Sequence, residues 1–134
     1  MSEISLITRE EAFKRAERIR REYKTIYCIE FELERAFIPL DDVVPTQAEL
    51  SEGKLLVVLQ EIKHGYDAPI IAIPYGGRYY IIDGHHRAFA LKRLGFESVE
   101  AILLKPPEEF VPGVVKTAEK EGLKKLEDIK IVRD

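Results

Sequence analysis

The stretch Asp83-Gly84-His85-His86-Arg87, hereafter the turn 83–87, decides how this chain is organised. It follows residues 78–82, Arg-Tyr-Tyr-Ile-Ile, a β-branched and aromatic run that is typical of a buried strand. It precedes residues 88–94, which are rich in strong helix formers and end at Gly95, a residue favoured just after a helix. The sequence therefore predicts a strand that passes through a tight turn into a helix.

This turn has the composition of an anion site. The first backbone N–H groups of a helix have no partner within the helix, and the helix dipole favours negative charge at that end. Gly84 lets the backbone approach a ligand closely, and Arg87 can hold a phosphate or carboxylate through a fork of donors. In the structural alternative, Asp83 caps the helix, Gly84 makes the turn and the histidines face solvent. The residues alone leave both interpretations open.

Composition predicts one domain spanning residues 1–134, long enough to bury a core without disulfides or metal. The net charge of −3 excludes a general basic footprint for nucleic acid but not a local groove. Cys28, the single cysteine, lies in an apolar run and is predicted to be a reduced core residue. No signal peptide or membrane-length apolar run is seen, so a cytoplasmic location is expected. The chain contains no Asn and is rich in Glu, Lys and Arg, a composition that is typical of thermophilic proteins.

An amphipathic helix is predicted near the N-terminus. The run Thr8-Arg9-Glu10-Glu11 fits a capping box, and the helix should extend to about Tyr23. Its apolar face consists of Ala12, Phe13, Ala16 and Ile19. Its other face carries the most basic patch of the chain, formed by Lys14, Arg15, Arg18, Arg20, Arg21 and Lys24. That face is interpreted as solvated helix surface or as a nucleic-acid contact, for which Arg18 and Arg21 are the candidate residues.

The rest of the chain alternates short strands and helices. Further strands are predicted at residues 25–31, 36–40, 69–73, 98–104 and 129–132, and helices at 46–63 and 114–121. The strands at 69–73 and 78–82 should form a hairpin through Gly76-Gly77. The start of the helix at 46–63 is left open, because Thr46 and Ser51 offer competing caps.

The order of these segments resembles the ParB-N/sulfiredoxin superfamily over residues 36–105. The matching blocks are Phe37-Ile38-Pro39-Leu40-Asp41-Asp42-Val43-Val44-Pro45, a helix, Gly65-x-x-x-Pro69-Ile70, the hairpin, the turn 83–87, a helix and a strand. The resemblance implies a compact α+β domain, a small mixed sheet with helices packed around it. Its glycine-x-x-arginine turn would bind nucleotide phosphates at a helix start. Residues 8–31 then precede this core, and residues 106–134 extend it. Sulfiredoxin chemistry is not expected, because His85 stands where sulfiredoxins carry their catalytic cysteine.

Within the superfamily, the turn is most similar to that of the archaeal free-serine kinases. Those enzymes use an aspartate-glycine-histidine-histidine-arginine run to hold ADP and transfer its phosphate to serine. They also carry a glutamate, just after a valine-proline-like turn, that acts as base on the serine hydroxyl. The closest ungapped match places Gln47 at that position, and a two-residue shift supplies Glu49.

The resemblance implies a nucleotide-binding domain that acts as an Mg²⁺-dependent phosphotransferase on a small hydroxyl compound such as serine. The nucleotide is expected to be ADP, ATP or CTP. It would be bound by Gly84, His85, His86, Arg87 and Gln47. His86 would neutralise developing charge and Asp83 would hold Mg²⁺ or orient a histidine. Glu49 would be the base, with Asp41 or Asp42 as weaker candidates.

Two other functions stay open. Partition proteins of the superfamily bind CTP and DNA, and some ParB-like domains are described as nucleases, so a DNA-binding or nuclease module is one alternative. The other is a non-catalytic regulator that keeps the turn 83–87 as a nucleotide sensor. Labelled phosphate transfer, salt-dependent DNA retention and nucleotide binding without turnover distinguish the three.

Overall fold

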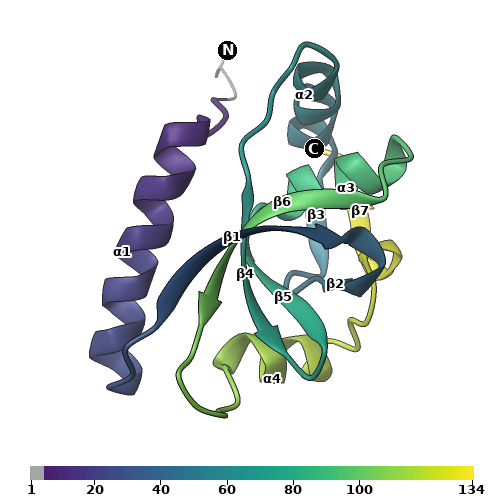
Figure 1. Cartoon of the computed structure of the whole chain (residues 1–134). Helices are drawn as coiled ribbons and strands as arrows, with labels where there is room; N and C mark the ends of the chain where they lie inside the picture. Colours follow the sequence, from purple (N-terminus) through teal and green to yellow (C-terminus); the bar gives the residue numbers. More distant parts are fainter. Residues whose placement is uncertain (1–4) are drawn as a thin grey trace.

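A mixed five-stranded sheet lies at the centre of the computed structural model, which describes residues 5–134 (Figure 1). Its strands, in the spatial order β1-β6-β4-β5-β2, are β1 Glu32–Pro39, β6 Ser98–Lys105, β4 Ile70–Tyr75, β5 Arg78–Asp83 and β2 Val43–Val44. The β1–β6 and β4–β5 pairs are antiparallel, whereas β4–β6 and β2–β5 are parallel. A separate parallel pair joins β3 (Glu49–Ser51) to β7 (Lys130–Val132). The predicted hairpin is the β4–β5 pair.

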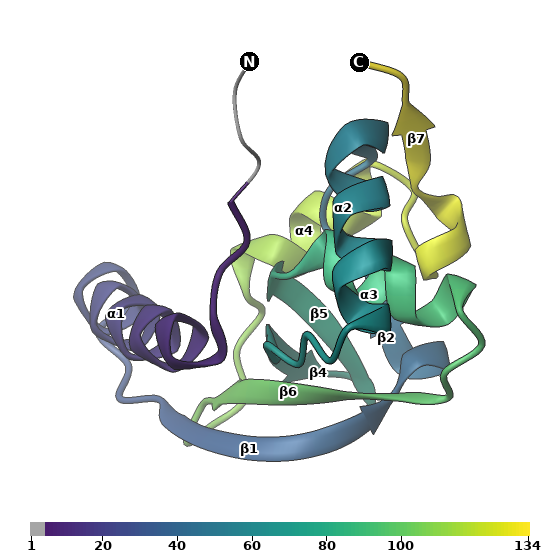
Figure 2. The same ribbon diagram turned by 90° about the horizontal axis from the view of Figure 1, so that it is seen from above.

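Helices pack on both faces of this sheet, as the view from above shows (Figure 2). They are α1 Arg9–Tyr27, α2 Glu52–Lys63, α3 His85–Arg93 and α4 Gly113–Lys120, with 3₁₀ turns at Leu40–Asp42 and Leu126–Asp128. The α+β prediction is therefore confirmed. Within residues 5–134, no helix combines the length and the apolar character that crossing a bilayer requires.

The central strand β4 shows why helices cover both faces. Ile70 and Ala72 belong to the core cluster that includes residues of α2 and α3. Ile71 and Ile73 belong to the cluster that includes residues of α1. Side chains alternate between the faces of a strand, so an unbroken apolar run fits a strand that is buried on both sides. The sheet thus holds α1 on one face and α3, which begins in the turn 83–87, on the other.

The capping box that opens α1 is confirmed. The Thr8 hydroxyl accepts from the Glu11 N–H at 3.1 Å, and Glu11 Oε1 accepts from the Thr8 N–H at 3.0 Å. The helix runs to Tyr27 rather than Tyr23, so the predicted strand at residues 25–31 is wrong. Tyr23 and Tyr27 meet edge to face, and both pack on further aromatic rings. This packing keeps residues 24–27 helical against their β-branched local preference.

Two further expectations are corrected. Cys28 is exposed rather than buried, because it ends α1 in the left-handed conformation (φ 57°) instead of continuing a strand. The helix predicted at residues 46–63 begins only at Glu52, because residues 49–51 pair with β7 near the C-terminal end. Ser51 is the cap, and its hydroxyl accepts from the Lys54 N–H at 3.2 Å. The predicted segments at 114–121 and 129–132 are confirmed as α4 and β7.

Candidate functional site

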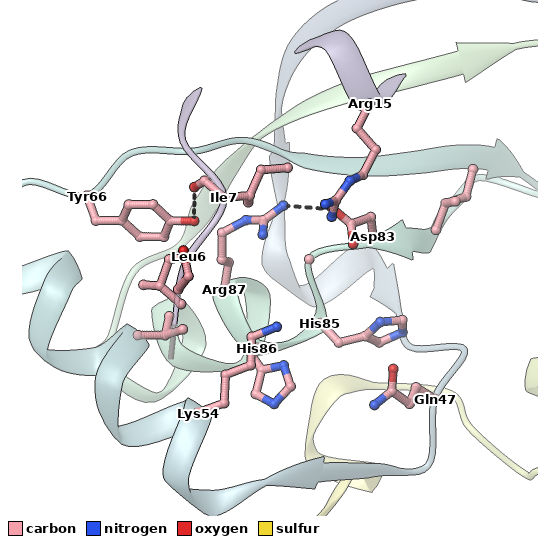
Figure 3. A pocket seen from close by; sticks show the side chains of 14 residues that line it. Leu6, Ile7, Arg15, Gln47, Lys54, Tyr66, Asp83, His85, His86 and Arg87 are labelled. Atoms are coloured by element: carbon pink, nitrogen blue, oxygen red, sulfur yellow. Dashed lines mark hydrogen bonds and ion pairs between the residues drawn. The ribbon is translucent and has the colours of Figure 1, made fainter. Parts of the chain in front are cut away.

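A cavity of about 310 Å³ opens where β5 passes into α3 (Figure 3). Besides the turn 83–87, its wall is formed by the first turn of α2, the loop before β3, α1, and residues 5–7 of the arm that precedes α1. Polar side chains dominate this wall, namely Arg15, Gln47, Lys54, Tyr66, Asp83, His85, His86 and Arg87. The Tyr66 hydroxyl donates to the Ile7 carbonyl at 2.6 Å and so ties the arm to the rest of the wall.

Gly84 is required by the geometry of the turn. Its φ of +108° lies in a region that side-chain-bearing residues rarely adopt. A Cβ at this position would lie 2.7 Å from Ile70 Cγ2 and 2.8 Å from Arg87 Nη2. The backbone therefore passes directly over β4, and α3 begins at the cavity wall. This geometry is that of a helix N-terminus open to an anionic ligand.

Arg87 is buried and incompletely paired. Its side chain is 9% exposed, and its Nη2 donates to the Pro69 carbonyl at 2.9 Å and lies 3.4 Å from Asp83 Oδ2. Its Nε is buried and has no hydrogen-bond partner within residues 5–134. Leaving a buried donor unpaired costs about 1–3 kcal/mol, more for a charged group. A ligand acceptor in the cavity would remove that cost.

His86 faces the same cavity with a second unpaired atom. Its Nε2 is buried and has no partner among the described residues. Burial, and then the positive charges of Lys54 and Arg87, lower the pKa of His86 from 6.5 to about 4. The imidazole is therefore neutral at pH 7, and it can donate or accept a hydrogen bond depending on its tautomer.

His85 connects the start of α3 to the loop before β3. Its Nε2 accepts from the Thr46 N–H at 2.9 Å, and the Thr46 hydroxyl donates to the Ile81 carbonyl at 2.7 Å. Burial is the main cause that lowers the pKa of His85 to about 4. Because Thr46 precedes Gln47, this contact fixes the loop that brings Gln47 to the cavity.

The cavity is positively charged in a protein whose net charge is negative. Arg15, Lys54 and Arg87 line it, whereas Asp83 is the one carboxylate among its described lining residues. Asp83 Oδ2 lies 3.1 Å from Arg15 Nη1 and 3.4 Å from Arg87 Nη2, and Figure 3 shows both arginines directed at it. These cations repel one another, and those at the starts of α2 and α3 also interact unfavourably with the helix dipoles. An anionic ligand would relieve both the repulsion between the cations and the unfavourable interaction with the dipoles.

The structure brings together the turn 83–87 and Gln47 but not the other predicted residues. Glu49 is exposed in β3 and does not belong to the cavity wall. Asp41 pairs with Lys92 instead, and Asp42 does not line the cavity either. No group of three or more potential metal-binding side chains occurs in the part of the chain that the structure describes. Asp83 is therefore the carboxylate to test as a metal ligand.

The basic face of α1 is largely paired with acidic residues. Arg18 lies 3.5 Å from Glu22, and Arg21 is exposed outside the cavity. Two further cations of this face pair with Glu17 and Glu30, namely Arg20 and Lys24. This pairing fits a solvated helix face better than a nucleic-acid track. The role of Arg18 and Arg21 in nucleic-acid binding stays a prediction.

Three titratable side chains of the wall were not predicted as site residues: Arg15, Lys54 and Tyr66. A signal existed for Lys54, because a cation in the first turn of a helix opposes the dipole and needs another reason to be there. For Arg15 the signal was its place beside the buried Ala16, at the edge of the apolar face. Tyr66 had no signal, because only the fold brings it to the arm.

Comparison with known proteins supplies independent information. The ParB N-terminal domain family matches residues 36–119, which include the predicted core at 36–105. An uncharacterized protein of Methanocaldococcus jannaschii is 36% identical over 122 residues, 89% of this chain and 45% of that protein. An ATP-dependent L-serine kinase of Staphylothermus marinus is 36% identical over 76 residues, 54% of this chain and 30% of the kinase. The chain thus spans less than half the length of these curated relatives.

A solved structure supports the fold assignment. The crystal structure of a protein from Agrobacterium tumefaciens matches with a TM-score of 0.60 at 17% identity. The match covers 75% of this chain and 63% of the other. At this identity the similarity concerns the fold alone, and it agrees with the α+β architecture described above.

Proposed function

The chain belongs to the ParB N-terminal domain family, and on that premise we propose that its cavity binds a nucleoside polyphosphate through the turn 83–87. One observation carries the proposal: Arg87 and His86 line the cavity at the start of α3, and each has a buried side-chain nitrogen, Nε and Nε2 respectively, without a hydrogen-bond partner among residues 5–134. Phosphate oxygens are strong acceptors and match an arginine fork at a helix N-terminus. ATP is the first nucleotide to test, because the Staphylothermus marinus relative is an ATP-dependent kinase, and ADP and CTP follow.

Each residue of the wall has a physical role in this proposal. Backbone N–H groups of residues 84–86 and the Arg87 guanidinium bind the phosphates. His86 hydrogen-bonds a phosphate oxygen through Nε2, and Lys54 adds a charge at the start of α2. Gln47 can donate or accept at the opposite edge, and His85 holds its loop in place through Thr46.

Asp83 fits the role of a single protein ligand for Mg²⁺. Mg²⁺ sites commonly use one or two carboxylates together with phosphate oxygens. Both arginines engage Oδ2 of Asp83, and Oδ1 has no partner within residues 5–134. When bound, the metal would neutralise charge on the phosphates.

The proposed reaction is transfer of the terminal phosphoryl group to a small hydroxyl compound, with serine as the first acceptor to test. The acceptor oxygen forms a bond to the terminal phosphorus, the bond to the bridging oxygen breaks, and the nucleoside diphosphate leaves with the electron pair. The hydroxyl proton goes to a base, for which Glu49 is our proposed residue. Such transfer depends mainly on positioning and electrostatics, which Arg87, His86 and Lys54 supply.

A second function is binding without transfer, as in a nucleotide sensor. A specific observation favours it: Gln47, which cannot accept the proton, lines the cavity, whereas Glu49 lies outside the wall. In this reading the turn 83–87 binds the nucleotide and the chain reports its presence. The two functions share one site and differ only in turnover.

The binding experiment is a thermal-unfolding series with ATP, ADP, AMP, CTP and pyrophosphate, each with and without Mg²⁺. A ligand at a hundred times its dissociation constant should add about 2.7 kcal/mol to the unfolding free energy. His86→Gln and Arg87→Gln should remove the shift. Arg93→Gln should keep it, because Arg93 is exposed on the same helix outside the cavity. If no compound stabilises the folded wild-type protein, the proposed site is wrong.

Turnover is measured separately, with ATP labelled in its terminal phosphate and with serine, other hydroxy amino acids or water as acceptors. Transfer that Glu49→Gln reduces, without loss of nucleotide affinity, supports the phosphotransferase. Binding without transfer to any acceptor supports the sensor instead.

A further inference from the structure

Helix α1 lies outside residues 36–119, which match the family, yet it contributes a side chain to the cavity. We propose that Arg15 binds the phosphates of the ligand and that Asp83 is the counter-ion it exchanges for them. This inference rests on the proposed function, because it names an additional binding residue and a binding step for the same site.

The geometry places Arg15 at the cavity with most of its donors free. Its Nη1 lies 3.1 Å from Asp83 Oδ2, and this is its one recorded hydrogen bond within residues 5–134. A guanidinium has five N–H donors, so most of them are available to a ligand. The side chains of Arg15 and Asp83 are 39% and 28% exposed, respectively, so a solute in the cavity can reach the pair.

Helix α1 holds Arg15 in a fixed place. Ala12 and Ala16, on either side of Arg15 in the sequence, are fully buried against the sheet. At the start of the helix, the Arg9 guanidinium donates to both carboxylate oxygens of Glu100 in β6, at 2.5 and 2.7 Å. A binding residue on such a fixed element loses less freedom when it meets its ligand than one on a loop.

The arrangement of the cations points to several phosphates in a row. Figure 3 shows Arg15 and Lys54 on opposite sides of Arg87, so the positive groups extend along the cavity. A single phosphate at the start of α3 would be served by Arg87 and the helix N–H groups alone. A chain of phosphates also reaches Arg15, so the contribution of Arg15 should grow with the number of phosphates.

The exchange follows from the charge of Asp83. In the ligand-free site its carboxylate neutralises part of the charge of two arginines. Phosphate oxygens compete for the same guanidinium donors and carry more charge. Once Arg15 turns to the phosphates, Asp83 loses a partner and becomes available to a cation that accompanies them.

The test is isothermal titration of the full chain with pyrophosphate, ADP and AMP, with and without Mg²⁺. Arg15→Gln should weaken pyrophosphate binding roughly ten- to a hundredfold, as expected for a charge-assisted hydrogen bond, and AMP binding by less than about threefold. Arg15→Lys should restore part of the affinity. The matched control is Arg18→Gln on the same helix, where Arg18 is 60% exposed and pairs with Glu22.

Pyrophosphate binding by Asp83→Asn distinguishes two roles of the Arg15–Asp83 ion pair: a counter-ion that the phosphates displace, or a contact that only stabilises the fold. Without its competing carboxylate, the site should bind Mg²⁺-free pyrophosphate more tightly, and Mg²⁺ should no longer strengthen binding. Weaker Mg²⁺-free binding in Asp83→Asn, or equal losses for AMP and pyrophosphate in Arg15→Gln, would overturn the inference. If Arg87→Gln loses pyrophosphate affinity and Arg15→Gln does not, the inference about Arg15 is overturned and the proposed function still stands. Failure of the wild-type protein to bind any phosphate compound would overturn both.

Discussion

The Nε2 atom of His85 accepts a hydrogen bond from the Thr46 backbone N–H at 2.9 Å, across 39 residues of chain. Since Nε2 is the acceptor, the ring is neutral and carries its proton on Nδ1. The contact joins the turn 83–87 to the loop that presents Gln47. The protonation state of one buried imidazole therefore bears on the shape of the cavity.

Acidification should destabilise the protein through His85. Burial lowers the pKa of its imidazole from 6.5 to about 4 in the folded state, so the unfolded chain binds a proton first as pH falls. The stabilising term is fully present above pH 6.5 and is lost as pH decreases from about 6.5 to 4. The free energy of unfolding should fall by up to about 1.4 kcal/mol per pH unit in this window, to a total on the order of 2–3 kcal/mol.

Urea unfolding between pH 4 and 8 measures this term. His85→Gln should reduce the slope between pH 6.5 and 4 without abolishing it, because it removes one of the two histidines whose pKa is lowered and leaves the contribution of His86. His64→Gln is the control, since His64 is exposed at the end of α2. A slope that His85→Gln leaves unchanged would show that other groups cause the acid sensitivity.

Gly84→Ala should lower the free energy of unfolding more than an alanine substitution at any other glycine with a positive φ. The new methyl group would lie 2.7 Å from Ile70 Cγ2 and 2.8 Å from Arg87 Nη2. Gly95→Ala is the matched control, because Gly95 has a similar φ of +90° and open space around its Cβ position. We expect about 1 kcal/mol for Gly95→Ala from backbone strain and roughly 2–4 kcal/mol for Gly84→Ala. Equal losses in chemical unfolding would contradict the close approach.

Glu100→Gln should loosen α1 from the sheet. The Glu100 side chain is 12% exposed, and its carboxylate contacts Arg9 of α1 and Arg35 of β1. Removing its charge should cost about 1–3 kcal/mol, as expected for a charged hydrogen-bonded group. Glu34→Gln is the control on the same sheet: its pair with Lys105 is half exposed, so a change below about 1 kcal/mol is expected. Indistinguishable unfolding free energies would show that Glu100 does not anchor α1.

Ligand binding should depend on pH through His86. Its imidazole is neutral at pH 7, with a pKa lowered to about 4 by burial, then by Lys54 and Arg87, while Asp134 acts in the opposite direction. A bound polyphosphate favours the charged imidazole and raises this pKa. Binding should therefore take up a proton, and affinity should rise as pH falls from 7 towards about 4, the pKa of His86 in the ligand-free protein.

Titration in two buffers of different ionisation enthalpy measures that proton uptake. Protonation of the phosphate itself contributes in both proteins, so the wild type is compared with His86→Gln. The difference in proton uptake between the two proteins is the contribution of His86. Identical proton uptake would mean that His86 stays neutral and acts only as a hydrogen-bond partner.

Local sequence was sufficient wherever a structural preference is decided within a few residues. The capping box of Thr8 and Glu11 forms as predicted, and the strand, turn and helix around Gly84 follow one another in the predicted order. The apolar runs of β4 and β6 became the central strands. Many of the strands and helices, and the order of strand, turn and helix around the turn 83–87, could thus be predicted from patterns of ten residues or fewer.

Local sequence misled where a distant partner outweighed the local preference. Residues 49–51 carry a helical pattern but form a strand, because Glu49 lies opposite Lys130 in a parallel pair. Tyr27 stays helical because it packs on Phe110, and Cys28 is exposed as a consequence. Neither partner lies within reach of a local pattern.

The sequence by itself determined the turn: its glycine, its arginine and its place between strand and helix. The tertiary structure decided which other charges meet there, since Arg15 is 68 residues from Asp83 and reaches it only because α1 packs on the sheet. It also gave the two histidines different surroundings: His85 is buried against Thr46, whereas His86 Nε2 has no partner among residues 5–134. The physical reason is that backbone preferences act between neighbours, whereas charge, burial and pKa depend on everything the fold brings within a few ångströms.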